Sequence, residues 1–419
     1  MGLLYRHPFF IYRRDSSAQK IVLLLKNGRR CDRIIIRKVV MRKPLSLYIH
    51  IPFCNSKCNY CNFVSFVRNP STKALYMDYL KKEIALRASE LSAKFEIQTI
   101  YIGGGTPSCL DAGEIAKLML AVYSNFTVSN SAEITIEINP NTLTLEKARE
   151  YLRAGINRFS IGLQSASPKL LKLMGRTHTY ADFEKAVGNL RRAGANNISA
   201  DIMLGLPTQT IADIDDVLKK VITLKISHIS AYMLSVEEGT PFARLKAIGE
   251  LVLPTERETL RQYNRVYKTL EANGYNRYEF SNFAKDGFQS RHNKIYWERK
   301  DYLGLGISAH SYVDGVRFAN TSDLNLYEDY LAKNNFALES KDKLTETEKK
   351  EEAIMLSLRT ANGLDLDEYE REFGENFVTT HKSALETLIK GKFLILDDKT
   401  LRATDNGFLV LNKIIEMLV

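Results

Sequence analysis

The chain has 419 residues, of which 45% are hydrophobic and 26% are charged. This length suits one large domain and a smaller one, and the composition is that of an ordinary globular protein. The net charge is +10, but residues 1–40 hold ten basic and two acidic residues, a net of +8, so the rest of the chain carries only +2. The longest apolar runs, such as IVLLL at residues 21–25, fall far short of the roughly 18 residues that a membrane span needs. The sequence therefore excludes a membrane-spanning segment and gives the body of the chain no electrostatic basis for binding nucleic acid.

Residues 1–43 form a basic N-terminal extension. Two interpretations stay open: an Arg-rich sorting or membrane-surface segment, or a sequence upstream of the true start. Met41 lies immediately before the first regular strand pattern, which favours the second interpretation. We therefore expect the extension to be dispensable, and leave a peripheral membrane association through it open.

From residue 44 the chain alternates strand-like and helical patterns in six units. The strands, rich in Ile, Val, Tyr and Phe, are predicted at residues 45–51, 99–102, 133–138, 157–163, 198–204 and 228–235. Helical periodicity is found at residues 72–92, 111–123, 144–155, 180–194 and 210–225. Gly155 and Gly194 lie where helix ends are expected. Because parallel strands joined by helices use right-handed crossovers, we predict an α/β fold with a partial TIM-like (β/α)6 barrel over residues 44–322, and keep a doubly wound open sheet as the alternative.

The pattern changes after residue 322. Helices are predicted at residues 345–360, 364–374, 381–392 and 407–418, with a hairpin at residues 393–404. The first three helices and the β-hairpin predict a small winged-helix-like domain over residues 344–419. Such domains often bind DNA, but these helices mix acidic and basic residues without a basic stripe. A packing or partner-binding role is therefore favoured over a nucleic-acid role.

Three of the five cysteines, Cys54, Cys58 and Cys61, lie in the segment CNSKCNYC directly after the first predicted strand. This is the carboxyl end of a strand, where barrel enzymes keep their chemistry. The C-x3-C-x2-C spacing can ligate three irons of a 4Fe-4S cluster and leave one iron open. A disulfide is disfavoured in a chain without a secretory signal, and a structural zinc ion would need a fourth ligand. Cys31 and Cys109 have no partner at a useful spacing.

The three-cysteine motif after YIHIPF, followed by GGGTP at residues 103–107, resembles the radical S-adenosylmethionine (SAM) superfamily. The resemblance implies that the amino and carboxylate groups of SAM complete the open iron. It also implies that an electron from the cluster can split SAM into methionine and a 5′-deoxyadenosyl radical, with the protein supplying binding and orientation. In this motif Gly104 and Gly105 lack the Cβ that would keep a backbone edge from the methionyl amine, and Thr106 follows them.

Within the superfamily the sequence is most similar to the branch that contains oxygen-independent coproporphyrinogen oxidase and the HemW haem chaperones. The matching motifs imply six further SAM contacts, namely Tyr48, Tyr60, Glu137, Gln164, Arg176 and Asp201. Glu137 and Asp201 would accept hydrogen bonds from ribose hydroxyls or an ammonium group, and Arg176 would pair with a carboxylate. Taken singly, each residue is better explained as a strand-end cap or a surface ion pair.

Two features separate the functions within this branch. The oxidase pattern adds a cysteine two positions after the third, where this chain has Phe63. The segment RHNKIYW at residues 291–297 matches the H-N-x-x-Y-W motif of HemW, which implies haem binding with His292 as the iron ligand and Trp297 beside the macrocycle. His310 is a second candidate ligand. The alternative is that His292 is a hydrogen-bonding loop residue and Trp297 a core anchor.

We therefore expect a cytoplasmic, radical SAM-type iron-sulfur haem chaperone that binds haem and delivers it to an apo-haemoprotein, without coproporphyrinogen oxidase activity. The expected cofactors are a 4Fe-4S cluster and SAM, with haem as cargo. An electron donor is an expected partner, and a homodimer is left open. The first alternative is an oxygen-independent coproporphyrinogen III oxidase that decarboxylates its substrate by radical chemistry. The second, a winged-helix nucleic-acid binder, is disfavoured by the even charge of the body.

Overall fold

The structure is a computed structural model that describes residues 22–27, 30–35 and 42–419. The chain divides into two compact units, Met1–Lys43 and Pro44–Val419. In the first unit, strands β1 (Val22–Asn27) and β2 (Arg30–Ile35) pair as an antiparallel hairpin. The interpretation of Met41 as the true start lies outside the described residues. The second unit carries the predicted site residues.

One twelve-stranded sheet forms the centre of this unit. Its strands lie in the order β14-β13-β12-β11-β3-β4-β5-β6-β7-β8-β10-β9. Their bounds are β3 Lys43–Ile51, β4 Phe95–Gly104, β5 Val128–Ile138, β6 Arg158–Gln164, β7 Ile198–Leu204, β8 His228–Met233, β9 Asn276–Arg277, β10 Asn282–Ala284, β11 Tyr302–Leu305, β12 His310–Val313, β13 Val316–Asn320 and β14 Leu338–Lys343.

The six predicted strands correspond to β3–β8, which are neighbours in chain order. From β4 to β8 each pair is parallel, and β11 adds a further parallel strand beside β3. A doubly wound sheet reverses its strand order at a switch point, and β3–β8 contain no such reversal. The two outer strands, β14 and β9, are not paired with each other. The partial barrel is therefore confirmed, and the doubly wound alternative is wrong.

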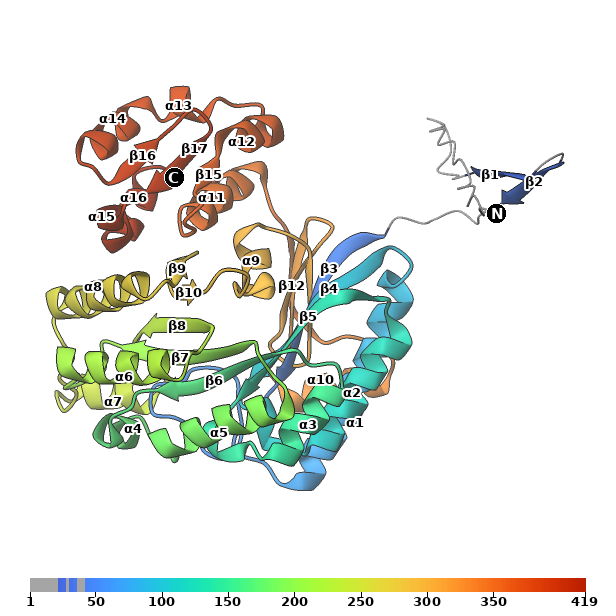
Figure 1. Cartoon of the computed structure of the whole chain (residues 1–419), viewed down its shortest axis with the longest axis horizontal. Helices are drawn as coiled ribbons and strands as arrows, with labels where there is room; N and C mark the ends of the chain where they lie inside the picture. The colour runs from blue at the N-terminus through green and yellow to red at the C-terminus, as the bar shows by residue number, and fades with distance from the viewer. Residues whose placement is uncertain (1–21, 28–29, 36–41) are drawn as a thin grey trace, which may run out of the picture. The chain divides into compact units, whose positions relative to one another are not determined.

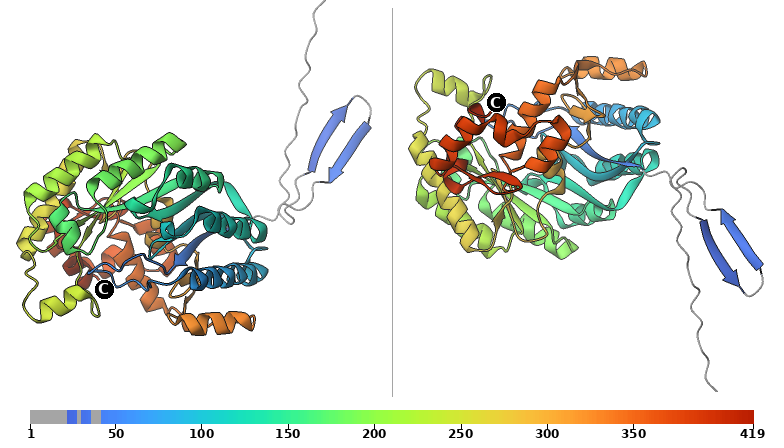
Figure 2. Two further views of the ribbon diagram at one scale, coloured as in Figure 1. Left: turned by 90° about the horizontal axis from the view of Figure 1, so that it is seen from below. Right: turned by 90° about the horizontal axis from the view of Figure 1, so that it is seen from above.

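Helices cover the outer face of this curved sheet, as Figures 1 and 2 show. Their bounds are α1 Pro70–Leu91, α2 Ala112–Asn125, α3 Leu145–Arg153, α4 Pro168–Leu173, α5 Tyr180–Ala193, α6 Ile211–Thr223, α7 Pro241–Ala247, α8 Glu256–Ala272, α9 Arg291–Trp297 and α10 Leu324–Ala332, with short 3-10 turns at Pro107–Cys109 and Pro140–Thr142. Capping boxes begin α5 at Thr179 and α6 at Thr210, because these side chains satisfy backbone N–H groups of the first turn. Gly194 ends α5 with a φ of +102°, as its position in the sequence predicts.

The strands present an apolar face to the helices and a more polar face to the barrel interior. On β6, Phe159 and Ile161 are fully buried in the hydrophobic core. The alternate residues Ser160 and Gly162 line an interior cavity. Because side chains alternate along a strand, the residues at the strand ends that face inward converge on one place. This alternation positions the site.

The C-terminal module has its own hydrophobic core and a three-stranded sheet in the order β15-β17-β16. Its elements are α11 Glu346–Ser357, β15 Leu364–Asp365, α12 Leu366–Phe373, α13 Phe377–Thr380, α14 Lys382–Lys390, β16 Leu394–Leu396, β17 Thr400–Ala403, α15 Asp405–Leu409 and α16 Leu411–Glu416. The predicted hairpin is present as β16 and β17, whereas the predicted last helix is broken at Val410. The module joins the barrel through a backbone hydrogen bond from Phe280 N to Arg359 O of 2.9 Å and an ion pair between Arg299 and Glu372. Among the described residues, every helix is too short or too polar to cross a membrane.

Candidate functional site

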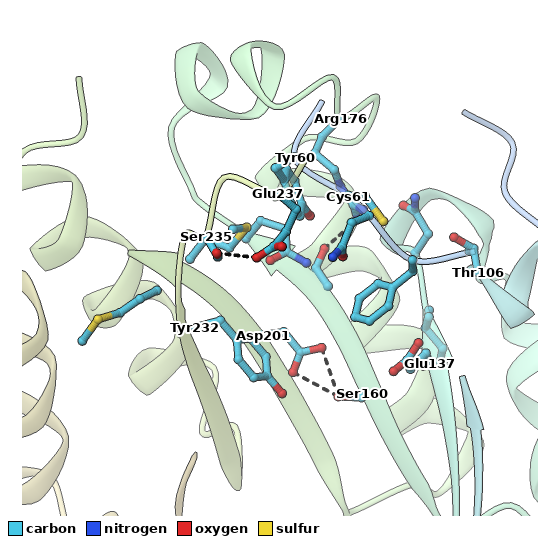
Figure 3. A pocket seen from close by; sticks show the side chains of 18 of the residues that line it. Tyr60, Cys61, Thr106, Glu137, Ser160, Arg176, Asp201, Tyr232, Ser235 and Glu237 are labelled. Carbon is cyan, nitrogen blue, oxygen red and sulfur yellow. Dashed lines mark hydrogen bonds between the residues drawn. The ribbon is translucent and has the colours of Figure 1, made fainter. Parts of the chain in front are cut away.

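Seven of the predicted site residues line one cavity at the carboxyl ends of the central strands, here called the main cavity (Figure 3). Its volume is about 410 Å³, within the range of small-molecule sites. The predicted residues that line it are Tyr60, Cys61, Thr106, Glu137, Gln164, Arg176 and Asp201. They come from five different strand ends or loops, so the barrel topology brings together residues that lie far apart in the sequence.

The three motif cysteines line a smaller neighbouring cavity, here called the cysteine cavity. All three are free thiols. Thr106 Oγ1 lies 3.5 Å from Cys54 Sγ, and Arg176 Nη1 donates to Cys58 Sγ over 3.6 Å. In the part of the chain that the structure describes, no three His, Cys, Asp or Glu side chains form a group that could hold a metal ion. A cubane cluster does not need such a group, because each thiolate binds a different iron. The donor set fits a 4Fe-4S cluster, with a hydroxyl and a guanidinium available to the thiolates.

The loop that carries the cysteines is tied to the rest of the fold by hydrogen bonds at both of its ends. Cys54 N donates to Phe66 O over 3.0 Å, which closes the loop on itself. Asn59 N donates to Met174 O over 2.9 Å, and Asn59 Nδ2 donates to Leu173 O over 2.8 Å. These bonds fix the backbone between the cysteines against the end of α4. A backbone that the protein's own hydrogen bonds fix loses less entropy when its side chains bind a group.

Two partly buried carboxyl groups, Glu137 and Asp201, form the floor of the main cavity (Figure 3). Glu137 Oε1 accepts from Tyr101 OH over 2.9 Å, and its Oε2 accepts from Gly104 N over 3.2 Å. Ser160 Oγ lies 3.1 Å from each carboxylate oxygen of Asp201. Burial raises the pKa of Glu137 to about 7, and also raises the pKa of Asp201. Such carboxyl groups suit a ligand that brings hydroxyl or ammonium donors, as the predicted SAM contacts require.

Gln164, at the end of β6, and Arg176, in the loop between α4 and α5, approach the main cavity from the same side. The register between β6 and β7 shifts at Gly162 and Gln164, and Gln164 has a φ of +64°. Such a bulge turns a side chain away from its regular direction, and here Gln164 lines the cavity. Arg176 Nη2 donates to Gly162 O over 2.9 Å and Nε to His178 Nδ1 over 3.2 Å. The guanidinium lines both the main cavity and the cysteine cavity, where it can meet an anionic group.

The glycines of the GGGTP motif are required by the protein's own packing. Gly104 has a φ of +110°, and a Cβ there would lie 2.6 Å from ring atoms of His50. A Cβ at Gly105 would lie 2.7 Å from Phe53 O. Their backbone N–H groups donate inward, Gly104 to Glu137 and Gly105 to Ile51 O. The predicted reason, close approach of a ligand, is therefore not needed to explain these glycines, although Thr106 beside them does line the main cavity.

Besides Gly104 and Gly105, which do not line the main cavity, two of the predicted SAM and haem residues, Tyr48 and His292, lie elsewhere. Tyr48 lines a separate cleft and lies 3.0 Å from His50 Nδ1 through its hydroxyl. His292 is only 1% exposed, on α9. Its Nδ1 is 2.7 Å from Thr99 Oγ1, and its Nε2 is 2.9 Å from Tyr296 OH.

The placement of His292 differs from the one expected of a haem ligand, and its role at haem stays a prediction. Both ring nitrogens are engaged inside the protein, and the ring stacks on Tyr101 at a centroid distance of 5.2 Å. Burial, with a smaller contribution from Arg158, lowers the pKa of His292 to about 3, so the ring is neutral. In this geometry neither nitrogen is open to an iron atom. His292 instead supports Tyr101, which holds Glu137.

Several lining residues were not predicted from the sequence. They are Asn139, Ser160, Met203, Tyr232, Ser235 and Glu237. Two of them lie on strands in phase with a predicted residue: Ser160 is on the inward face of β6 with Gln164, and Met203 is two positions after Asp201 on β7. Strand alternation could have found these. Ser235 and Glu237 follow β8 on a loop, and no periodic signal marks them.

Two family models match the chain. Residues 48–221 match the Radical SAM superfamily, and residues 344–410 match the HemN C-terminal domain. The class defined by fold and site is thus a radical SAM protein with a HemN-type C-terminal module.

Relatives extend the match over nearly the whole chain. "Heme chaperone HemW" of Lactococcus lactis is 33% identical over 90% of this chain and 98% of its own length. "Radical S-adenosyl methionine domain-containing protein 1, mitochondrial" of Danio rerio is 31% identical over 89% of this chain and 86% of its own. A solved structure of coproporphyrinogen III oxidase (HemN) from Escherichia coli, described as a radical SAM enzyme, superposes with a TM-score of 0.79 at 25% identity, covering 90% of each chain. The chain belongs to the HemW family of radical SAM proteins.

Proposed function

We propose that this protein is a radical SAM-type haem chaperone, which binds haem and transfers it to an apo-haemoprotein. The observation that carries the proposal is the 33% identity to a heme chaperone HemW over 98% of that relative's length. In this proposal Cys54, Cys58 and Cys61 hold a 4Fe-4S cluster, and SAM occupies the main cavity. Haem is the cargo.

The residues of the main cavity suit SAM by their chemistry. Arg176 lies beside both the thiols and the cavity, so it can neutralise a carboxylate near the cluster. Glu137 and Asp201 face the same space with oxygens that accept hydrogen bonds from ribose hydroxyls or an ammonium group. A bound cluster and SAM supply one-electron chemistry. An electron donor is therefore a partner that this proposal requires, and a cytoplasmic location is a further part of it.

The alternative function is oxygen-independent coproporphyrinogen III oxidation, which the TM-score of 0.79 with HemN favours. Fold similarity alone does not decide between two chemistries on one scaffold. Phe63 stands where the oxidase pattern has its additional cysteine, and its side chain is 63% exposed at the wall of the main cavity. This difference at the cavity favours the chaperone.

The test uses the full chain, reconstituted anaerobically with iron and sulfide. We expect about four irons per chain, lost when Cys54, Cys58 and Cys61 are replaced together by Ala. The protein should bind one haem per chain, as followed by the Soret band in difference spectra. With SAM, a reductant and coproporphyrinogen III it should form no protoporphyrinogen IX. Turnover that depends on the three cysteines would overturn the chaperone in favour of the oxidase.

A further inference from the structure

The histidines of the structure differ sharply in whether they can bind a metal. Six of the seven histidines are described. Four of these are at most 4% exposed and have both ring nitrogens in hydrogen bonds, namely His50, His178, His228 and His292. A nitrogen that already has a partner can ligate iron only after that hydrogen bond breaks. Two candidates remain.

The first remaining histidine, His381, lies on the C-terminal module. Its Nδ1 is 3.0 Å from Phe377 O, and its ring stacks on Phe377 at a centroid distance of 4.1 Å. The second, His310, begins β12 and is exposed. Within the described chain neither of its ring nitrogens has a hydrogen-bond partner. His310 is therefore the described histidine whose two nitrogens are both open.

His310 lies in a cleft of about 380 Å³ that also contains three tyrosines, here called the tyrosine cleft. The lining residues are Tyr48, His50, Asn62, Phe63, Val64, Tyr296, Tyr302, Ser308 and His310. Tyr296 and Tyr302 pack edge to face at a centroid distance of 4.8 Å. Aromatic rings around one open imidazole match the needs of a planar macrocycle with a central iron.

The backbone holds His310 firmly at this cleft. A Cβ at Gly304 of β11 would overlap the carbonyl oxygen of His310, so this glycine lets β12 come close to β11. The connecting loop is anchored by Glu83, which is fully buried and accepts from Gly306 N over 2.7 Å. Ser308 in the same loop has a φ of +55° and donates its N–H to Thr321 O over 2.9 Å. Unfavourable backbone conformations persist where the surroundings impose them, and they are concentrated at functional sites.

The tyrosine cleft shares a wall with the main cavity. Asn62 and Phe63 line both, and they directly follow the cluster residue Cys61. The exposed ring of Phe63 presents an apolar surface between the two spaces. A macrocycle in the tyrosine cleft would therefore lie next to SAM in the main cavity, with Phe63 between them.

We propose that the tyrosine cleft is the haem site and that His310 is the axial ligand of the haem iron. This inference rests on the proposed haem chaperone function. It replaces His292, whose nitrogens are both engaged inside the protein, with a histidine on another element of the barrel.

The experiment is a haem titration of the cluster-loaded full chain, comparing wild type with His310→Ala, His310→Met and His381→Ala. We expect His310→Ala to weaken haem binding at least about tenfold and to lose the imidazole-ligated spectrum, with recovery when free imidazole is added. His310→Met should retain haem with a changed spectrum, because a thioether is also a haem ligand. His381→Ala is the matched control and should behave as wild type.

The outcomes distinguish a failure of the haem chaperone function from a failure of the tyrosine cleft as the haem site. A wild type that binds no haem would remove the proposed function together with this site. Haem binding by wild type with an unchanged affinity and spectrum in both His310 variants would leave the function and overturn the site. A loss in His381→Ala alone would move the ligand to the C-terminal module. Iron content and circular dichroism of each variant check that the fold and the cluster are intact.

Discussion

Replacing Thr99 by valine tests whether His292 is held inside the protein as the structure has it. Thr99 is 1% exposed on β4, and its hydroxyl donates to Ser46 Oγ over 2.8 Å. With that proton directed to Ser46, the Nδ1–H of His292 donates to the same oxygen over 2.7 Å, and Nε2 accepts from Tyr296 OH. Valine has nearly the same shape but no hydroxyl, so it would leave two buried polar groups without a partner.

The expected loss follows from these two groups. A buried donor or acceptor left unpaired costs about 1–3 kcal/mol, so two such groups in Thr99→Val should lower the free energy of unfolding by about 2–6 kcal/mol. Thr99→Ser is the matched control, because it keeps the hydroxyl and removes one methyl group, worth about 1 kcal/mol. Trp297 is the single tryptophan and ends α9, so urea unfolding followed by its fluorescence reports on the helix that carries His292.

A Thr99→Val variant as stable as Thr99→Ser would refute the role of the Thr99 hydroxyl. Equal stability would mean that the hydroxyl contributes nothing to holding the ring. His292 would then be free to turn toward a ligand, and its predicted role at haem would regain support. Haem titration of the same two variants distinguishes this case, because a released imidazole would strengthen binding in the valine variant only.

Three further predictions concern Glu137, Gly104 and the N-terminal extension. Because burial raises the pKa of Glu137 to about 7, the native state keeps a proton that the unfolded chain loses, so stability should fall as pH rises from 4.5 to 7. Glu137→Gln should remove this loss of stability, which is at most about 3 kcal/mol in the wild type. Urea unfolding midpoints of both proteins at pH 4.5 and pH 7 measure it. If the stability of the wild type and of Glu137→Gln changed equally with pH, the raised pKa of Glu137 would be refuted. Gly104→Ala should destabilise by about 2–4 kcal/mol through its positive φ and the contact with His50, whereas Gly113→Ala, with open space around it, should be neutral or stabilising in the same melts. A chain beginning at Met41 should fold and load iron, SAM and haem as the full chain does, and failure to fold would give the extension a structural role.

Local sequence patterns were sufficient to predict the strands of the barrel and their order. The strands β3–β8 fall where runs rich in Ile, Val, Tyr and Phe predict them, because such side chains pack well on a pleated, buried strand. Alternation along each strand, with right-handed crossovers, places the inward residues at the strand ends together. This is why Glu137 and Asp201, chosen from separate motifs, line one cavity. The spacing of the cysteines likewise predicted three thiols on one loop.

Tertiary structure decided which of the histidines and tyrosines are open. The motif at residues 291–297 predicted a haem ligand, but α9 packs against β4, so that Thr99, far away in the sequence, occupies one nitrogen of His292. Tyr48 lies in the tyrosine cleft rather than the main cavity because β11 pairs with β3 and brings His310 beside it. Whether a polar side chain binds a ligand or a neighbouring residue depends on which residues pack against it. Those residues come from distant segments of the chain, so the spacing of a motif cannot specify them.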